Sequence, residues 1–289
     1  MRYLSYVRGN VAGLGIVANG GEIRGLLSTE EGYPGSLGDI VGDCQALIDA
    51  STILGCAPVV DPAEISFAPP VTRPGKIICV GLNYHDHATE SGFERPQFPT
   101  IFARFPSSLI GHGDPLVCPS SSRQFDFEGE MAAVIGKSGR YIQKSNALAH
   151  VAGYSIFNDG SVRDVQLRTP QWTLGKNFDG TGAFGPYFVT ADELPAGAAG
   201  LRLETVLNGI VVQSASTDDM IFNVAELVKI ISSAMTLEVG DIIVSGTPSG
   251  IGHARTPPLY MEEGGLCEVR VEGLGVLSNP IISEVSLAA

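Results

Sequence analysis

The stretch Phe125-Asp-Phe-Glu-Gly-Glu-Met-Ala-Ala-Val-Ile-Gly136 predicts a β-strand in which acidic and apolar side chains alternate. Successive side chains of a strand point to opposite faces, so residues two apart share a face. The first face is expected to be apolar and to carry Phe125, Phe127, Met131, Ala133 and Ile135. The second begins with three acids and then becomes apolar, with Asp126, Glu128, Glu130, Ala132 and Val134.

Three neighbouring carboxylates on one face of a strand create an electrostatic problem. Like charges repel at this spacing, and burial would raise the pKa values of the acids. A bound divalent cation removes both difficulties, and ligands that are all oxygen favour Mg²⁺, Mn²⁺ or Ca²⁺ over Zn²⁺. Taken by itself, the strand fits a solvated, half-exposed edge without a metal at least as well.

A further carboxylate favours the metal. Asp159 ends an apolar strand and opens a short turn that is dense in polar groups. With Glu128 and Glu130 it would complete a set of three carboxylates that leaves octahedral positions open for water and substrate. On their own, Asn158 and Asp159 would be an ordinary turn and N-cap.

Outward from this strand, the chain after residue 76 consists of short strands separated by glycines and prolines. Strands are expected at 76–80, 131–135, 187–189, 201–207, 242–244 and 266–271, and helices only at 161–167 and 224–233. The sequence therefore predicts a mixed β fold with few helices, arranged as a mostly antiparallel roll or sandwich.

The first 70 residues predict a small α+β unit. Residues 13–27 alternate around Asn19-Gly20-Gly21, which is typical of a β-hairpin. Residues 36–54 follow a helical period whose shared face would carry Ile40, Cys44, Leu47 and Ile48. A proline-rich connector follows at 67–75. We therefore expect an N-terminal domain at 1–70 and a catalytic domain at 71–289.

The composition argues against two classes of partner. The 289-residue chain has a formal net charge of −13, which repels nucleic-acid phosphates and anionic lipids. No stretch approaches the ~18 consecutive apolar residues of a membrane-spanning helix.

The five cysteines lack the spacing of a metal site, and the N-terminal residues lack the apolar run of a signal peptide. We therefore expect a cytoplasmic protein with reduced thiols.

Several sequence blocks occur in the order found in one enzyme family. They are GLNYHDHATE (81–90), FDFEGEMAAVIGK (125–137), VAGYSIFNDGSVRDVQ (151–166), WTLGKNFD (172–179), FGPYFVT (184–190), TLEVGDIIVSGTPSGIG (236–252) and GLGVLSNP (273–280). Through these blocks the chain resembles the fumarylacetoacetate hydrolase superfamily over residues 76–280. The resemblance implies a β-sandwich roll, a homodimer and a site for Mg²⁺ or Mn²⁺. In a crystal, Ca²⁺ could occupy the same site.

The resemblance also assigns roles to residues. It implies that the metal is bound by Glu128, Glu130 and Asp159, and that Lys176 lies beside the metal and the substrate. The residues that it places against the substrate are Arg163, Gln166, Gly246 and Thr247. The chain departs from many members at Leu82 and at Arg104-Phe105-Pro106, and these positions touch the substrate pocket. The identity of the substrate therefore does not follow from the family.

His87 and Glu90 match the general base of the hydrolytic members. If their segment is helical, the two residues are three apart and face the same way. The carboxylate would then fix the tautomer of the imidazole and raise its basicity, as deprotonation of water requires. The alternative is a surface lid in which both side chains are merely solvated. The other histidines considered are expected to be structural or exposed: His112, His150 and His253.

The substrate expected for such a site is an acylpyruvate, a 2,4-dioxo acid. Its C1 carboxylate and C2 oxygen would bind the metal, and His87, oriented by Glu90, would activate water for attack at C4. Cleavage of the C3–C4 bond would release a carboxylate and a pyruvate enolate, whose charge the metal and Lys176 would stabilise. The alternatives are decarboxylation of oxaloacetate, isomerisation or hydration of a 2-oxo diacid of aromatic catabolism, and a metal-binding dimer without activity.

Overall fold

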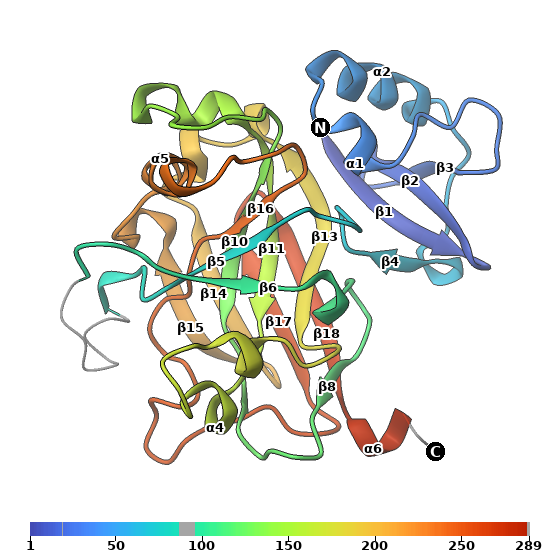
Figure 1. Cartoon of the computed structure of the whole chain (residues 1–289). Helices are drawn as coiled ribbons and strands as arrows, with labels where there is room; N and C mark the ends of the chain where they lie inside the picture. Colours follow the sequence, from blue (N-terminus) through green and yellow to red (C-terminus); the bar gives the residue numbers. More distant parts are fainter. Residues whose placement is uncertain (19, 87–95, 288–289) are drawn as a thin grey trace.

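The structure is a computed structural model that describes residues 1–18, 20–86 and 96–287. Two β-sheets pack face to face, and a smaller unit of strands and helices is attached along one edge (Figure 1). Helices are few and mostly short. The predicted class, a mixed β fold with few helices arranged as a roll or sandwich, is confirmed.

The larger sheet has 11 strands and continues into the N-terminal unit. Its strands, in spatial order, are β3 (Ile23–Leu27), β2 (Val11–Val17), β1 (Arg2–Arg8), β13 (Gly182–Thr190), β11 (Val151–Asp159), β10 (Gly129–Ile135), β16 (Ile242–Val244), β5 (Ile77–Gly81) and β6 (Thr100–Arg104). β4 (Ser66–Ala68) pairs with β1, and β7 (Leu109–Ile110) pairs with β13. Neighbouring strands are antiparallel except β16 with β5 and β13 with β7.

The second sheet has five strands and covers one face of the first. They are β15 (Ile210–Ser216), β14 (Arg202–Leu207), β17 (Leu266–Val271), β18 (Gly275–Ser283) and β8 (Leu116–Cys118). A separate pair joins β9 (Phe125–Asp126) to β12 (Ser161–Val162). This pair lies at the ends of β10 and β11, where the acidic residues are.

The acidic strand predicted within residues 125–136 lies between two hydrophobic cores, as its alternation predicts. Met131, Ala133 and Ile135 of β10 pack in the core between the two sheets. Ala132 and Val134 face a second core that includes residues of the N-terminal unit. Because both faces of β10 are buried, the solvated-edge alternative for this strand is wrong.

The helices differ from expectation in two places. α5 (Val224–Ala234) matches the helix predicted at 224–233, whereas the one expected at 161–167 is the single turn α4 (Arg163–Gln166). The helix expected at 36–54 is broken into α1 (Leu37–Ile40) and α2 (Cys44–Gly55), because Asp43 caps the second helix by accepting from the amide of Gln45 at 2.8 Å. The break changes the buried face, so that Cys44 and Ile48 are exposed.

The N-terminal unit shares the large sheet with the rest of the chain. The hairpin predicted over 13–27 is present as β2 and β3. β1 pairs with β13 in the register Arg2↔Val189, so the sheet crosses the proline-rich connector without interruption. Whether residues 1–70 fold independently of the rest of the chain therefore remains a prediction.

A short helix α6 (Glu284–Leu287) follows β18. Within the described residues, no helix has the length and hydropathy needed to cross a membrane.

Candidate metal centre and substrate cavity

The three predicted metal ligands meet at the adjacent ends of β10 and β11. Gly129 pairs with Asn158, and the amide of Asp159 donates to the carbonyl of Glu128 at 2.9 Å. This register places Glu128, Glu130 and Asp159 so that one carboxylate oxygen of each lies within 4.8 Å of the others. All three residues are buried. The cluster that sequence spacing predicted is therefore present.

Buried cations form ion pairs with two of the three carboxylates, those of Glu128 and Asp159. The ammonium of Lys176 lies 2.7 Å from Glu128 Oε2 and 2.7 Å from Asp159 Oδ2. Arg104 forms a buried ion pair with the other oxygen of Asp159. Burial on its own lowers the pKa of Lys176, but the charges of Asp159 and Glu128 outweigh it and the pKa is raised. Lys176 is therefore held as a cation, 1% exposed.

Glu130 has no cation of its own within the described part of the chain. Its carboxylate accepts a 2.5 Å hydrogen bond from the amide of Gly246. Burial, and then the charges of Asp159 and Glu128, raise the pKa of Glu130 well above its usual range. A dication between the three oxygens would supply the missing positive charge, and an all-oxygen donor set suits Mg²⁺ or Mn²⁺. The residues present therefore fit a divalent metal ion.

Asp126 does not join the cluster, although it shares its strand face in the predicted alternation. Regular pairing stops after β9 and resumes at Gly129, and this break turns Asp126 away. Its Oδ2 accepts from Arg163 Nε at 2.8 Å and from the amide of His253 at 2.9 Å. Asp126 therefore serves as a buried acceptor for the cavity wall and leaves three acids for the metal.

Arg163 and Gln166 lie on one wall, on the single turn of α4. Nη1 of Arg163 is 2.7 Å from Glu128 Oε1 and donates to Gln166 Oε1 at 2.9 Å. Nη2 is buried and has no hydrogen-bond partner among the described residues. Burial by itself lowers the pKa of Arg163, and the charges of Asp126 and Glu128 more than reverse this. Arg163 is thus a fixed cation whose Nη2 has no partner among the described residues.

The segment after β16 supplies the remaining predicted contacts. Gly246 has φ +99°, a left-handed conformation that favours glycine, and its amide points at Glu130. Thr247 donates from Oγ1 to the carbonyl of Gly129 at 3.0 Å and accepts from Gln213 at 2.8 Å. Of these two, Thr247 lines the cavity, whereas Gly246 acts on the cluster.

A cavity of about 400 Å³ opens over the cluster. Its polar lining comes from Glu128, Arg163, Gln166, Lys176, Thr247 and His253. Its apolar lining includes Val80, Leu82, Phe102, Leu167, Trp172 and Ile251. The rings of Phe102 and Trp172 pack edge to face, with centroids 5.5 Å apart. Most of the residues predicted to bind a substrate thus share one cavity of a size typical for small ligands.

The expected general base cannot be placed, because His87 and Glu90 lie outside the described residues. The chain just before them is firmly held. Asn83 donates to the carbonyl of Ser245 at 2.7 Å and accepts from the amide of Phe222 at 2.8 Å. The pairing of His87 with Glu90 remains a prediction from the sequence.

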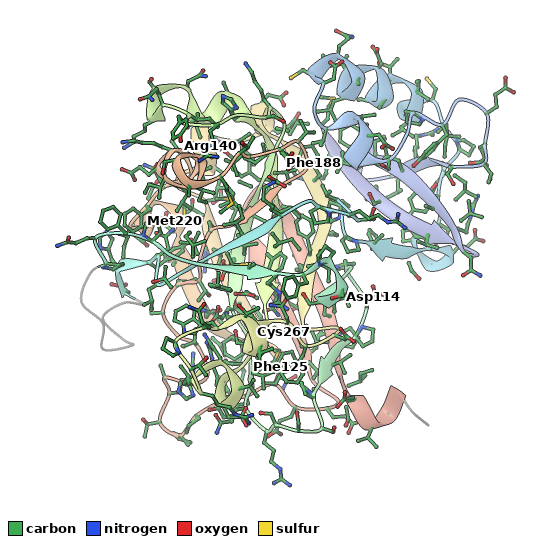
Figure 2. All side chains as sticks on the ribbon, viewed as in Figure 1. Asp114, Phe125, Arg140, Phe188, Met220 and Cys267 are labelled. Atoms are coloured by element: carbon green, nitrogen blue, oxygen red, sulfur yellow. The ribbon has the colours of Figure 1, made fainter. Side chains whose placement is uncertain are left out.

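Three described residues have roles that their sequence pattern does not predict. Arg104, seen only as a departure from the family, is fully buried against Asp159. Trp172 forms part of the apolar lining, and His253, expected to be structural or exposed, lines the cavity while remaining exposed to solvent. A lone basic or aromatic residue carries no period or spacing, so only the fold could reveal these positions. Figure 2 shows the crowded interior around the labelled Phe125 and Cys267, which belong to the same hydrophobic core.

The fumarylacetoacetate (FAA) hydrolase C-terminal family model matches residues 76–282. This range contains every carboxylate and cation of the cluster. The chain belongs to the fumarylacetoacetate hydrolase family. Membership accounts for the order of the sequence blocks, and the buried three-carboxylate cluster agrees with a divalent-metal site in this member of the family.

Three known proteins illustrate the range of the family. The chain is 37% identical over 289 residues to the bovine mitochondrial oxaloacetate tautomerase FAHD2A, covering 98% of this chain and 92% of that protein. A fumarylacetoacetate hydrolase from Exiguobacterium antarcticum has a similar structure, with TM-score 0.84, 34% identity, and coverage of 98% of this chain and 100% of that one. Maleylpyruvate hydrolase from Sphingobium sp. SYK-6, solved with manganese(II) and pyruvate, gives TM-score 0.80 at 26% identity, covering 98% and 99%.

Proposed function

We propose that this protein is a divalent-metal-dependent enzyme that interconverts the enol and keto forms of oxaloacetate. The main support is the buried cluster of Glu128, Glu130 and Asp159, with the Lys176 ammonium against it at the polar end of the cavity. A relative that aligns over 98% of this chain is named an oxaloacetate tautomerase. C–C hydrolysis of an acylpyruvate, the first expectation from the sequence, therefore becomes the second candidate.

The chemistry of enolisation explains why such a site is useful. Moving a proton from C3 of a 2-oxo acid leaves negative charge on the C2 oxygen. When bound, the dication supplies Lewis-acid stabilisation of that charge. Lys176 adds a fixed positive charge in buried surroundings, where electrostatic interactions are stronger than in water. Arg163 Nη2 offers a donor to a substrate carboxylate, and Gln166 holds the guanidinium in place.

One observation keeps hydrolysis of an acylpyruvate as a second candidate. The apolar lining, with Phe102 and Trp172 in contact, offers more apolar surface than oxaloacetate can use. An acyl group beyond C4 of a 2,4-dioxo acid would fill it. Hydrolysis also needs a base for water, and the predicted His87–Glu90 pair would supply one.

Product analysis tests the proposed function and separates it from the alternatives. We expect the protein with Mg²⁺ to accelerate loss of the enol form of oxaloacetate, followed by its ultraviolet absorbance, without release of CO₂ or pyruvate. Chelation of the metal should abolish this effect, because the charge at the C2 oxygen is then left to Lys176 alone. Pyruvate released from an acylpyruvate would establish hydrolysis instead, and pyruvate with CO₂ from oxaloacetate would establish decarboxylation.

We further propose that the protein is a homodimer. Among the described residues β6 forms one edge of the large sheet, and the nearby side chains of Phe98, Ile101 and Phe105 are exposed. An uncovered edge strand with apolar side chains tends to associate in water. Sedimentation at micromolar concentration should therefore give twice the 30.3 kDa of one chain. A fully active species at the mass of one chain would contradict the proposal.

A further inference from the structure

One wall of the cavity carries donors that the metal cluster does not occupy. Arg163 Nη2 is buried and has no hydrogen-bond partner among the described residues, although Nε and Nη1 are both engaged. His253 lines the same cavity from the segment that follows β16. A buried guanidinium nitrogen without a partner is costly, so its presence beside a cavity indicates an anionic ligand group.

Asp126 holds these two residues together. Its Oδ2 accepts from Arg163 Nε at 2.8 Å and from the backbone amide of His253 at 2.9 Å. Its Oδ1 accepts from the amides of Gly252 at 2.8 Å and Phe127 at 2.9 Å. Because one fully buried carboxylate ties α4 to the His253 segment, Arg163 and His253 have a fixed relative position. Asp126 is thus a positioning residue for this wall.

The ring of His253 is also oriented. Nδ1 lies 3.0 Å from the hydroxyl of Tyr260. If the hydroxyl donates, the proton of the neutral imidazole is on Nε2, and in the charged imidazolium Nε2 also carries a proton. In both states Nε2 is a donor, and no described residue accepts from it. With its hydroxyl as the donor to Nδ1, Tyr260 thus prepares His253 to donate from Nε2 to a ligand.

We propose that His253 is a specificity-determining residue that, with Arg163, binds the distal carboxylate of a dicarboxylic 2-oxo acid. The metal cluster would take the 2-oxo carboxylate end, and this wall would take the opposite end. The inference rests on the proposed function, since it assumes that a 2-oxo acid occupies the cavity. It goes further by naming the residues that recognise the second carboxylate of the substrate and so select for diacids.

A matched pair of ligands isolates the distal carboxylate. Oxaloacetate and 2-oxobutanoate share four carbons and the 2-oxo acid end, and differ by a carboxylate in place of a methyl group. We expect the Mg²⁺-loaded wild-type protein to bind oxaloacetate more tightly. His253→Ala should weaken oxaloacetate binding about 10-fold, the loss of one charge-assisted hydrogen bond at a site open to solvent, and leave 2-oxobutanoate unchanged. Equilibrium binding by calorimetry measures both.

Two further variants separate ligand binding from support of the loop. His253→Gln keeps a donor and should restore part of the affinity for oxaloacetate. Tyr260→Phe keeps the ring of His253 but removes its hydroxyl anchor, so the loss should be smaller than in His253→Ala and confined to oxaloacetate. Equal weakening of both ligands in His253→Ala would overturn the proposal, because the residue would then act on the shape of the whole cavity.

The outcomes distinguish this inference from the proposed function. A wild-type protein that binds both ligands equally, or a His253→Ala variant with unchanged oxaloacetate affinity, would overturn the distal-carboxylate site even if the enzyme is a tautomerase. A selective loss of oxaloacetate binding in a protein without tautomerase activity would support the site and refute the proposed reaction.

Discussion

Glu130→Gln should lower the affinity for Mg²⁺ by more than about 100-fold and abolish metal-dependent activity. Residues that merely orient metal ligands are worth 10–100-fold in affinity, and Glu130 offers its oxygen directly. The amide keeps the size of the side chain and can still accept from Gly246, so the backbone around β10 has no reason to move. Titration of Mg²⁺ by calorimetry measures the affinity.

The stability of Glu130→Gln without metal shows whether a loss of Mg²⁺ affinity comes from misfolding. The pKa of Glu130 is raised in the folded protein, so its ionised form costs stability at pH values above its unfolded pKa. Removing that charge should make metal-free Glu130→Gln at least as stable as the metal-free wild type at pH 7. Glu31→Gln, an exposed change in the N-terminal unit, should match the wild type in both measurements. Wild-type Mg²⁺ affinity in Glu130→Gln would remove the residue from the metal site.

The buried strand β10 and the N-terminal hairpin could be predicted from the local pattern of apolar and turn residues. The alternation in β10 gave both of its buried faces, and the turn at Asn19-Gly20-Gly21 gave the hairpin of β2 and β3. The metal cluster followed because two ligands share one strand and the third, Asp159, ends another apolar strand and opens a polar turn; the resemblance to the family assigned the same three residues. These elements could be derived because each one's evidence lies within a few residues of sequence.

The features that sequence analysis missed depend on contacts between distant segments. Asp126 has the same sequence signal as Glu128, yet a break in pairing makes it an acceptor for Arg163 and His253. Arg104 at the end of β6 meets Asp159 at the end of β11 although three strands lie between them in the sheet order, so only the fold reveals the contact. The split of the helix at 36–54 has a local cause in Asp43, whose capping role competes with a helical period that continues through it. A capping residue inside a periodic stretch is therefore a reason to expect a break.

Lys176→Met should leave Mg²⁺ affinity intact or raise it, while lowering kcat by about 10²–10³-fold with a smaller effect on KM. The ammonium is 2.7 Å from both Glu128 and Asp159, so it competes with a dication for the same oxygens. During enolisation the same charge stabilises the developing oxyanion, and loss of one preorganised donor of this kind costs about 10²–10³-fold. Glu130→Gln should thus weaken metal binding and Lys176→Met should not, although both variants should lower turnover.

Measuring Mg²⁺ affinity and kcat in the same variant shows whether Lys176 stabilises the reaction or only holds the metal ligands. Methionine has nearly the length of lysine but loses the charge, and with it the cation–π contact in which the ammonium lies 5.0 Å from the ring centre of Phe102. The metal-free variant should be less stable than the wild type, because two buried carboxylates lose a cation, and added Mg²⁺ should recover most of that loss. Lys229→Met, an exposed change on α5, is the matched control and should behave as wild type. If metal affinity falls together with kcat in Lys176→Met, the lysine acts by holding the ligands in place. If kcat stays at the wild-type value, the negative charge of the reaction develops elsewhere in the cavity. The proposal that the C2 oxygen lies beside Lys176 is then wrong.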